Sequence, residues 1–562
     1  MKNSFRGLAL GISILFTFSG LCNAGPMVTV LNGTYEGYHS SHQQQDIFLG
    51  IPYAQPPVGN LRFRAPQSLN ETWSEPKSAL EYSDVCMQYV ASPGVPMSED
   101  CLSLNIVRPS NIDQRKRLPV AVWIHGGGLF AGSSRSPNLT NFARQAADGD
   151  KPLIAVTINY RLSAFGFLWG SDEVKAKGSA NNGLRDQRLA LYWIQENIGF
   201  FGGDPRKVTL FGQSAGGLST GKQLIVYGGR DDGLFRAAIM QSGGMAEKWP
   251  YNIQDPYIYT KDLYQNLTTS TGCADKSSPF ECLRSLPVER LSKALNISNT
   301  AVFSGTGLGP WLTQVDGDFL QDDPTMSLER NKFNPVPIIY TTATDEATVF
   351  MYGGKIDTDE DFRQFVAAGG PDRQTVSTIE MLYPNINSVG LPAGYEPSEG
   401  DDLQYGSQWK RAVAFHTDVV ETTSRRQTLD AWARNGGTAF SARIDLHLAG
   451  TPPRLGSHHS AELPYVFNSV SGKAADKGYT RMSSLMSRAW ASFISDLDPN
   501  HHGVRGFSKW PAWNVTNVDG VGSNIVFHTA EGGVFRTFVE KDDYRLAQTQ
   551  FINSVMHCQM FY

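Results

Sequence analysis

The sequence predicts an α/β protein with a central, mostly parallel twisted sheet, flanking helices and long loop insertions. Short apolar runs rich in Val and Ile, typical of buried strands, recur between residues 118 and 448. Segments with helical apolar spacing separate some of these runs, as the crossovers of a parallel sheet require. Hydrophobic residues make up 41% of the 562 residues and charged residues 18%, which is typical of a soluble globular protein with a large core.

The expected strands can be placed in chain order. They occupy residues 118–128 (a strand that runs into a glycine loop), 152–162, 207–212, 335–346 and 439–448. Residues 183–198 carry apolar side chains at helical spacing, and a second helix begins at residue 216. Because no long polar linker divides the chain, we expect a single domain over residues 25–562.

The first 24 residues predict a secretory signal peptide. Lys2 and Arg6 precede an apolar run over residues 8–18, and small residues end at Ala24, the expected cleavage site. The run is too short to span a bilayer, and no later segment approaches that length. We therefore expect a secreted protein without a stable membrane anchor.

Export affects how the cysteines are interpreted. In an oxidising compartment the close pairs predict the disulfides Cys86–Cys101 and Cys273–Cys282. Cys558 is left over, as either a buried free thiol or a link to another chain. The cysteines lack the partner Cys or His pairs of a zinc site, so no metal is expected.

Asn-X-Ser/Thr sequons, which predict surface glycosylation in an exported protein, occur six times: Asn32, Asn70, Asn138, Asn266, Asn296 and Asn514. The formal net charge of -5 gives no basic footprint for nucleic acid. The sequence does not indicate an oligomeric state.

The stretch "LFGQSAGGLST" predicts a nucleophile at Ser214. The serine stands between the strand at 207–212 and the helix that begins at Gly216. Gly212 and Gly216 permit a tight turn that lifts the hydroxyl above the sheet edge, beside the positive end of the helix. A plain glycine turn is the alternative, and the flanking strand and helix argue against it.

A serine nucleophile needs a base and an acid, which follow it in the chain order Ser, acid, His of the α/β-hydrolase arrangement. His458 and His459 lie in a Gly/Ser-rich loop after a strand, whereas His416 and His447 lie in helix-like and strand-like runs and are expected to be structural. Asp345 and Glu346 are the last two residues of the stretch 335–346, just past its apolar strand. The residues alone do not choose within either neighbouring pair.

The expected oxyanion donors lie upstream and next to the serine. Residues 126–128 form a glycine run after a strand, and glycines let backbone N–H groups turn inward. The amide of Ala215 completes the set.

These motifs resemble the type-B carboxylesterase/lipase family, the cholinesterase-like branch of the α/β-hydrolases. The matching stretches include "GIPYAQPPVGNLRFRAP", "SEDCLSLNI", "VWIHGGGLFAGSS", "VTLFGQSAGG" and "HHSAELPYVF", and they extend from about residue 50 to residue 500. The resemblance implies a Ser214–Glu346–His459 triad and oxyanion donors at Gly127, Gly128 and Ala215. It also implies the two disulfides and a structural ion pair between Arg62 and Glu99.

Some residues depart from the family pattern. The segment between Cys86 and Cys101 is short and lacks Trp, which argues against a choline site and against a large lipase-style lid. Gln213 replaces the acidic residue that precedes the serine in cholinesterases. Gly307 and Gly309 stand where cholinesterases carry aromatic walls, so a roomier acyl pocket is expected.

The function that this resemblance implies is hydrolysis of a small-molecule carboxylic ester through an acyl-enzyme, without a cofactor or metal. A lipase or an acyltransferase would use the same triad. A non-catalytic adhesion module related to this family is the remaining alternative, although all three triad positions are present.

Overall fold

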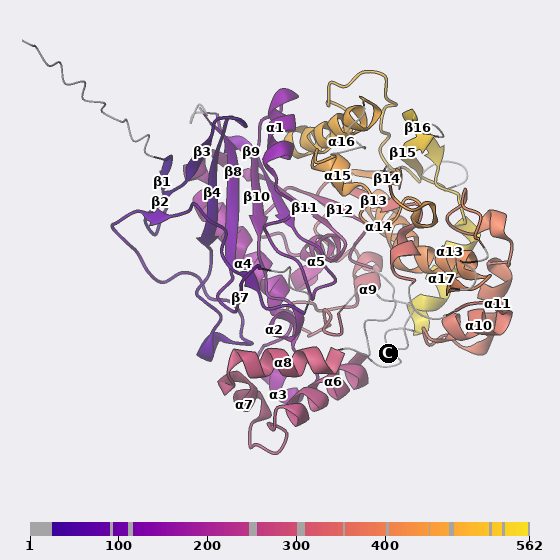
Figure 1. Ribbon diagram of the computed structural model, residues 1–562, viewed down its shortest axis with the longest axis horizontal. Helices are drawn as coiled ribbons and strands as arrows, with labels where there is room; N and C mark the ends of the chain where they lie inside the picture. The colour runs from indigo at the N-terminus through magenta and orange to yellow at the C-terminus, as the bar shows by residue number, and fades with distance from the viewer. Residues whose placement is uncertain are drawn as a thin grey trace, which may run out of the picture.

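The computed structural model describes residues 25–89, 94–110, 116–246, 256–299, 309–351, 355–398, 400, 404–448, 450–470, 477–515, 520–530 and 534–559. A large twisted sheet runs through this part of the chain, with helices packed on both of its faces (Figure 1). The expected signal peptide, residues 1–24, and Gly307 lie outside the described residues.

Within the described residues, the main sheet has eleven strands in the order β16-β15-β14-β13-β12-β11-β9-β10-β8-β4-β3. Their bounds, in chain order, are β3 Tyr38–Ser40, β4 Gln45–Pro52, β8 Ser103–Pro109, β9 Leu118–Ile124, β10 Ile154–Ile158, β11 Gly203–Gln213, β12 Ala237–Gln241, β13 Ile338–Ala343, β14 Ala439–Asp445, β15 Ser523–Ala530 and β16 Val534–Lys541.

In sheet order, the neighbouring strands from β15 through β9 to β10 are mutually parallel. The strand pairs at both ends of the sheet are antiparallel. The parallel pairs are separated in sequence by helices, as a crossover connection requires. Smaller sheets, β1–β2–β5 (Met27–Thr29, Thr34–Glu36, Lys77–Ser78) and β6–β7 (Val85–Cys86, Met97–Ser98), lie outside it.

Alternate side chains of the central strands pack in two hydrophobic cores, one on each face of the sheet. Val120 and Val122 of β9 belong to one core, and Ala121 and Trp123 to the other. Successive residues of a strand point to opposite faces, so a strand buried on both sides must be apolar throughout. This explains the continuous apolar runs in the sequence.

The helices divide between these two faces. Helices α1 (Thr140–Asp148) and α16 (Lys477–Asp496) cover one face, and α4 (Asn182–Asn197) and α5 (Ala215–Gly229) cover the other (Figure 1). The remaining α-helices are α2 Ser163–Phe167, α3 Asp172–Ala176, α6 Pro256–Ser270, α7 Pro279–Ser285, α8 Val288–Asn299, α9 Pro324–Glu329, α10 Asp359–Ala367, α11 Arg373–Leu382, α13 Trp409–Thr417, α14 Thr423–Arg434, α15 Leu463–Val466 and α17 Leu546–Gln559.

Short helical turns complete the architecture. The 3-10 turns are η1 Gly59–Leu61, η2 Ile198–Phe201, η3 Glu346–Val349, η4 Asn387–Val389 and η6 Pro453–Leu455. The π-helix η5, Asp418–Thr422, joins α13 to α14.

Both expected cysteine pairs are joined in the structure. The S–S distances are 2.01 Å for Cys86–Cys101 and 2.03 Å for Cys273–Cys282. Between these two cross-linked regions, Arg62 and Glu99 form a bidentate ion pair at 2.6 Å, and both side chains are only 7% exposed. The Arg62 guanidinium also donates to backbone carbonyls near α7, so the pair ties the N-terminal segment to that helix.

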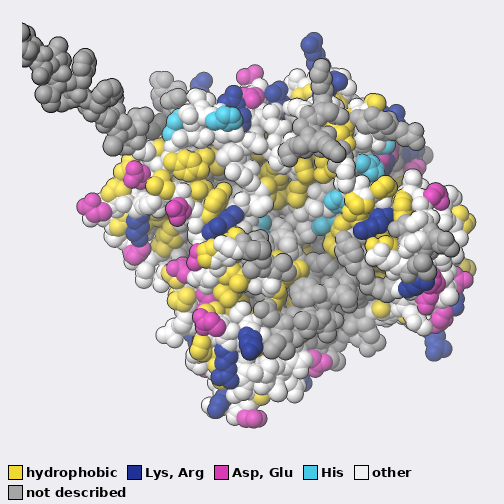
Figure 2. All heavy atoms as spheres, viewed as in Figure 1, with side chains coloured by type: hydrophobic (Ala, Val, Ile, Leu, Met, Phe, Trp, Pro, Cys, Tyr) yellow, Lys and Arg dark blue, Asp and Glu magenta, His cyan; other side chains and the backbone are white. Residues whose placement is uncertain are grey.

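The surface carries several expected features. Asn70, Asn138, Asn266 and Asn514 are exposed, and Asn32 is half-buried; the side chains of Asn296 and Cys558 lie outside the described residues. Lys and Arg side chains are interspersed with Asp and Glu over the face shown in Figure 2. Of the helices in the described ranges, none is both long and apolar enough to cross a membrane.

Candidate active site

Four parallel strands end at the edge of the sheet that carries the site. The oxyanion loop follows β9, Ser214 follows β11, Glu346 follows β13, and the loop with His459 comes after β14. The carboxyl ends of parallel strands share one edge of a sheet, so residues far apart in sequence meet there.

Ser214 occupies a strained turn between β11 and α5. Its backbone has φ 59° and ψ -130°, a conformation with positive φ that is uncommon for a residue with a side chain. A Cβ at Gly212 would lie 2.3 Å from the Gly216 carbonyl oxygen, and one at Gly216 would lie 2.0 Å from the Ile124 carbonyl oxygen. Both glycines are therefore required for the close approach of strand and helix.

The turn is held by backbone hydrogen bonds on either side of the serine. The Ser214 amide donates to the Gln241 carbonyl of β12 at 2.9 Å, and the Leu218 amide donates to the Ser214 carbonyl at 2.8 Å. Ser214 is the N-cap residue of α5, so its side chain lies at the positive end of the helix.

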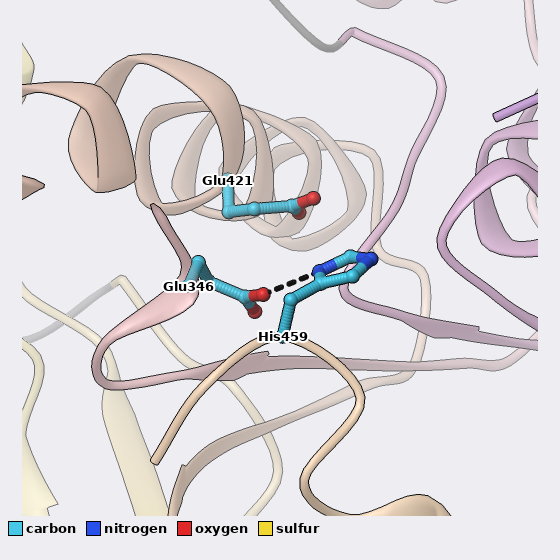
Figure 3. A group of neighbouring side chains, drawn as sticks. All are labelled: Glu346, Glu421 and His459. Carbon is cyan, nitrogen blue, oxygen red and sulfur yellow. Dashed lines mark hydrogen bonds and ion pairs between the residues drawn. The ribbon is translucent and has the colours of Figure 1, made fainter. Parts of the chain in front are cut away.

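His459 and Glu346 form a buried pair. His459 Nδ1 lies 2.6 Å from Glu346 Oε2, and the two side chains are 11% and 1% exposed (Figure 3). The other carboxylate oxygen of Glu346 accepts the Ala343 amide of β13 at 2.5 Å. This arrangement assigns the proton at Nδ1 to the bond with Glu346 and leaves Nε2 with a lone pair.

The neighbours of this pair point elsewhere. Asp345 accepts the Ser457 amide at 2.8 Å, and burial raises the pKa of its carboxyl to about 7. His458 Nδ1 bonds to the carbonyl oxygen of His459 at 2.7 Å. The contacts therefore differ within each neighbouring pair: Glu346, not Asp345, contacts the ring of His459, and His458 bonds elsewhere.

The second ring nitrogen of His459, Nε2, faces a residue that the sequence did not connect to it. The side-chain nitrogen of Gln213 lies 3.1 Å from His459 Nε2. In the described part of the chain, no direct hydrogen bond joins the Ser214 hydroxyl to the ring. The structure therefore brings Glu346 and His459 together and places Ser214 next to the residue whose side-chain amide contacts the ring.

The oxyanion loop approaches the serine from the end of β9. A Cβ at Gly126 would lie 3.0 Å from Ser214 Cβ, so the backbone of this loop passes directly beside the nucleophile. Gly127 has φ 105°, and a Cβ there would lie 2.2 Å from the Ala131 carbonyl oxygen. Gly128 follows with φ 60°.

His125, at the start of this loop, is a structural residue. Its ring stacks on Tyr160 with centroids 4.4 Å apart, and its Nδ1 bonds to the Gly126 carbonyl at 2.8 Å. Burial lowers the pKa of His125 to about 4, so the ring stays neutral near neutral pH.

Two other loops support the oxyanion loop. From the segment that follows Cys86, Gln88 accepts the Gly132 amide at 2.8 Å. The Gly309 amide donates to the Gly128 carbonyl at 2.9 Å, which puts the segment expected to form the acyl pocket in direct contact with the oxyanion loop. Neither contact was predicted from the sequence.

Two further buried carboxyl groups lie near the pair, and sequence reasoning assigned no role to either. Glu421 comes from η5, and Glu462 lies three residues after His459. Glu462 accepts the Gln241 side-chain amide at 3.0 Å. Burial, followed by the charge of Glu346, raises the pKa of Glu462 to about 7.

The site offers donors for a cation, but their spacing fits a hydrogen bond better. One ligand atom each from Glu346, Glu421 and His459 lies within 4.8 Å of the others (Figure 3). Two ligands of a tetrahedral ion with bonds of about 2.0 Å stand about 3.3 Å apart. The 2.6 Å contact between His459 and Glu346 is shorter, as expected when the two groups share a proton.

The two other histidines considered downstream of the serine lie away from the pair. His416 is fully buried in α13, and burial lowers its pKa to about 4. His447 follows β14, and its amide bonds to Thr529 Oγ1 at 3.3 Å. Both have the structural positions expected of them.

Comparisons with known proteins agree with this geometry. The model of the carboxylesterase family matches residues 24–524. Lipase 4 of Diutina rugosa is 34% identical over 96% of this chain and 97% of its own, and the secreted triacylglycerol lipase LIP1 of Gibberella zeae is 31% identical over 93% and 89%. Other relatives are also named secreted lipases.

Solved structures agree as well. Aspergillus niger EstA superposes with a TM-score of 0.80 at 27% identity, covering 96% of this chain and 99% of its own. PNB esterase gives a TM-score of 0.73, also at 27% identity, over 94% and 99%. Together with the family match, these similarities show an α/β-hydrolase fold and a carboxylic ester hydrolase: the chain belongs to the carboxylesterase family.

Proposed function

We propose that the chain hydrolyses carboxylic esters through an acyl-enzyme on Ser214, with His459 as the base and Glu346 as the acid. The observation that carries the proposal is the 2.6 Å contact between Glu346 and His459 Nδ1, on a ring whose other nitrogen faces the elbow that holds Ser214. A base oriented in this way has its lone pair at the turn that holds the nucleophile, where it can exchange one donor for the other.

The first half-reaction forms the acyl-enzyme. When an ester enters, Nε2 exchanges the Gln213 amide for the Ser214 hydroxyl and takes its proton as Ser214 Oγ bonds to the carbonyl carbon. The negative charge on the carbonyl oxygen is stabilised by the amides of Gly127, Gly128 and Ala215. The bond to the alcohol oxygen then breaks, and the proton on Nε2 passes to the departing alcohol.

The second half-reaction releases the acid. Water gives a proton to His459 Nε2 and bonds to the acyl carbon, the Ser214 ester bond breaks, and the same proton returns to Ser214. Glu346 stays ionised and stabilises the imidazolium in both halves. The cycle requires no cofactor or metal.

Ser214→Ala tests the proposal directly. The variant should lose about four or more orders of magnitude in kcat on p-nitrophenyl esters, and wild-type protein should be labelled at Ser214 by a fluorophosphonate. Full activity in Ser214→Ala would refute the mechanism. Absence of labelling in correctly folded wild-type protein would instead favour the adhesion module.

A lipase is the second candidate, because several relatives bear that name. A true lipase should gain activity when the same ester is raised above its solubility limit, and an esterase should not. The short segment between Cys86 and Cys101, packed on the oxyanion loop through Gln88, favours the esterase. Adding a competing alcohol and analysing the products separates hydrolysis from acyl transfer.

Export as one catalytic unit over residues 25–562 is part of the proposal. Relatives named as secreted, the joined cysteine pairs and the exposed sequons support it. Protein secreted by a eukaryotic host should begin at Gly25 and lose mass on treatment with an N-glycosidase. An N-terminus that retains residues 1–24 would contradict it.

A further inference from the structure

Glu421 faces the triad from an element that carries no proposed catalytic residue. Its side chain belongs to η5 and is buried, and its carboxylate points toward Glu346 and the ring of His459 (Figure 3). A carboxylate oxygen of Glu421, an oxygen of Glu346 and a ring nitrogen of His459 all lie within 4.8 Å of one another.

The backbone that carries Glu421 is held in place where η5 begins. Before η5, the hydroxyl of Thr417 accepts the Ala347 amide at 3.2 Å, which ties α13 to the turn that carries Glu346. Asp418, the first residue of η5, pairs with Arg545 at 2.8 Å and accepts the Tyr383 hydroxyl at 2.8 Å. A π-turn changes which side chains face inward, and such turns often occur at functional sites.

Buried carboxyl groups lie around the ring of His459. Glu346, Glu421 and Glu462 are all at most 2% exposed and surround a single imidazole. Other buried titratable groups lie on the elements packed here, among them Asp345 beside Glu346, Asp418 on η5 and His416 on α13. His459 therefore has a second buried carboxyl group, that of Glu421, close to its ring.

We propose that Glu421 is a positioning residue of the triad, a second buried carboxyl group that can orient the ring of His459. This rests on the proposed function and deepens it. If Glu346 is removed, Glu421 is left as the carboxyl group close to the ring. Glu421 then orients the ring in place of Glu346.

A double-mutant series tests this takeover. Active sites are first counted by fluorophosphonate labelling, and kcat and KM are then measured per active site for Glu346→Ala, Glu421→Gln and the combined variant. Removal of the acid of a triad ordinarily costs about 10⁴-fold in kcat. We expect about 10²-fold or less for Glu346→Ala and about 10⁴-fold for Glu346→Ala/Glu421→Gln, with KM nearly unchanged.

Two matched variants separate positioning from structural support. Glu346→Ala/Glu421→Asp keeps a carboxylate and should recover at least part of the activity. Glu346→Ala/Asp430→Asn removes a different acid instead. Asp430 lies on α14 and accepts a hydrogen bond from the Trp513 indole N–H at 3.0 Å, so this variant should have the same kcat as Glu346→Ala alone. If Glu421→Gln does not fold, Glu346→Ala decides by itself: a loss near 10⁴-fold overturns the proposal.

The two proposals fail in different ways. Equal kcat per active site in Glu346→Ala and Glu346→Ala/Glu421→Gln would overturn the role of Glu421, even with Ser214→Ala inactive. An active Ser214→Ala variant would instead overturn the mechanism on which that role rests.

Discussion

The side-chain amide of Gln213 lies 3.1 Å from His459 Nε2, the ring nitrogen that takes the serine proton in the proposed mechanism. An amide N–H donates to a ring nitrogen only when that nitrogen carries a lone pair, so Gln213 favours the neutral ring. A carboxylate at the same position would instead accept a hydrogen bond from the charged ring and so favour the protonated form.

Gln213→Glu should therefore move the acid-side limit of kcat/KM to higher pH. The added carboxylate stabilises the protonated ring, and a protonated ring cannot act as the base. Gln213→Met, which removes the donor without adding charge, should move this limit less. The measurement is kcat/KM between pH 5 and 9, and an unchanged limit in Gln213→Glu would show that the amide does not influence the base.

Gly127→Ala should damage the oxyanion loop. The new methyl group would meet the Ala131 carbonyl at 2.2 Å, at a residue whose φ is 105°. Displacing an oxyanion donor should lower kcat about 10²- to 10³-fold with little change in KM. Gly178→Ala is the matched control, because Gly178 has φ 63° with open space around it; its kcat should stay at the wild-type value. Wild-type kcat in Gly127→Ala would remove that residue from the oxyanion hole.

Glu462 should make stability depend on pH. The pKa of this buried carboxyl is raised from 4.5 to about 7, so the native state keeps a proton that the unfolded chain has already released above pH 4.5. Between these two values the free energy of unfolding falls as the pH rises, by about 3 kcal/mol in total. Glu462→Gln should remove this fall and therefore gain stability relative to the wild type toward pH 7.

Thermal melting of both proteins at pH 4.5 and pH 8 checks this sign. Glu75→Gln, at an exposed glutamate, should leave the pH dependence unchanged. A relative loss of stability in Glu462→Gln on going to higher pH would contradict the assignment of a proton to this carboxyl.

Glu99→Gln should destabilise the fold. The substitution leaves the buried Arg62 guanidinium without its charged partner, which typically costs about 3–5 kcal/mol. Lys77→Gln breaks the exposed Lys77–Glu71 pair, whose side chains are 41% and 57% exposed, and should cost at most about 1 kcal/mol. Urea unfolding midpoints compare the two variants, and equal midpoints would show that the buried pair contributes no more than the exposed one.

The sequence predicted the parts of this molecule that depend on local pattern. The strand expected at 207–212 lies within Gly203–Gln213, and the helix expected at 183–198 is observed as Asn182–Asn197. These elements were visible because strands buried on both faces are continuously apolar and a helix repeats its apolar face. Shorter or half-exposed strands, such as β12 and the antiparallel β16, carried no such signal.

The same distinction explains what was missed at the site. The turn around Ser214 depends on residues only a few positions away, so the local motif "GQSAGG" predicts it. The contact of Gln213 with His459 spans 246 positions, and the approach of Glu421 depends on a π-turn without a sequence signature of its own. Choosing Glu346 over Asp345 from the residues alone fails for a related reason, since consecutive side chains in a loop point in directions that only the surrounding packing determines.

The hydrogen bond from the Gly309 amide to the Gly128 carbonyl joins the segment expected to form the acyl pocket to the loop expected to hold the oxyanion. Substitutions around Gly309 that admit bulkier acids would displace the Gly128 carbonyl. That carbonyl belongs to the peptide unit next to the one expected to hold the reacting oxygen. Variants with a wider substrate range should therefore become slower as well, unless that single backbone contact is preserved in the redesign.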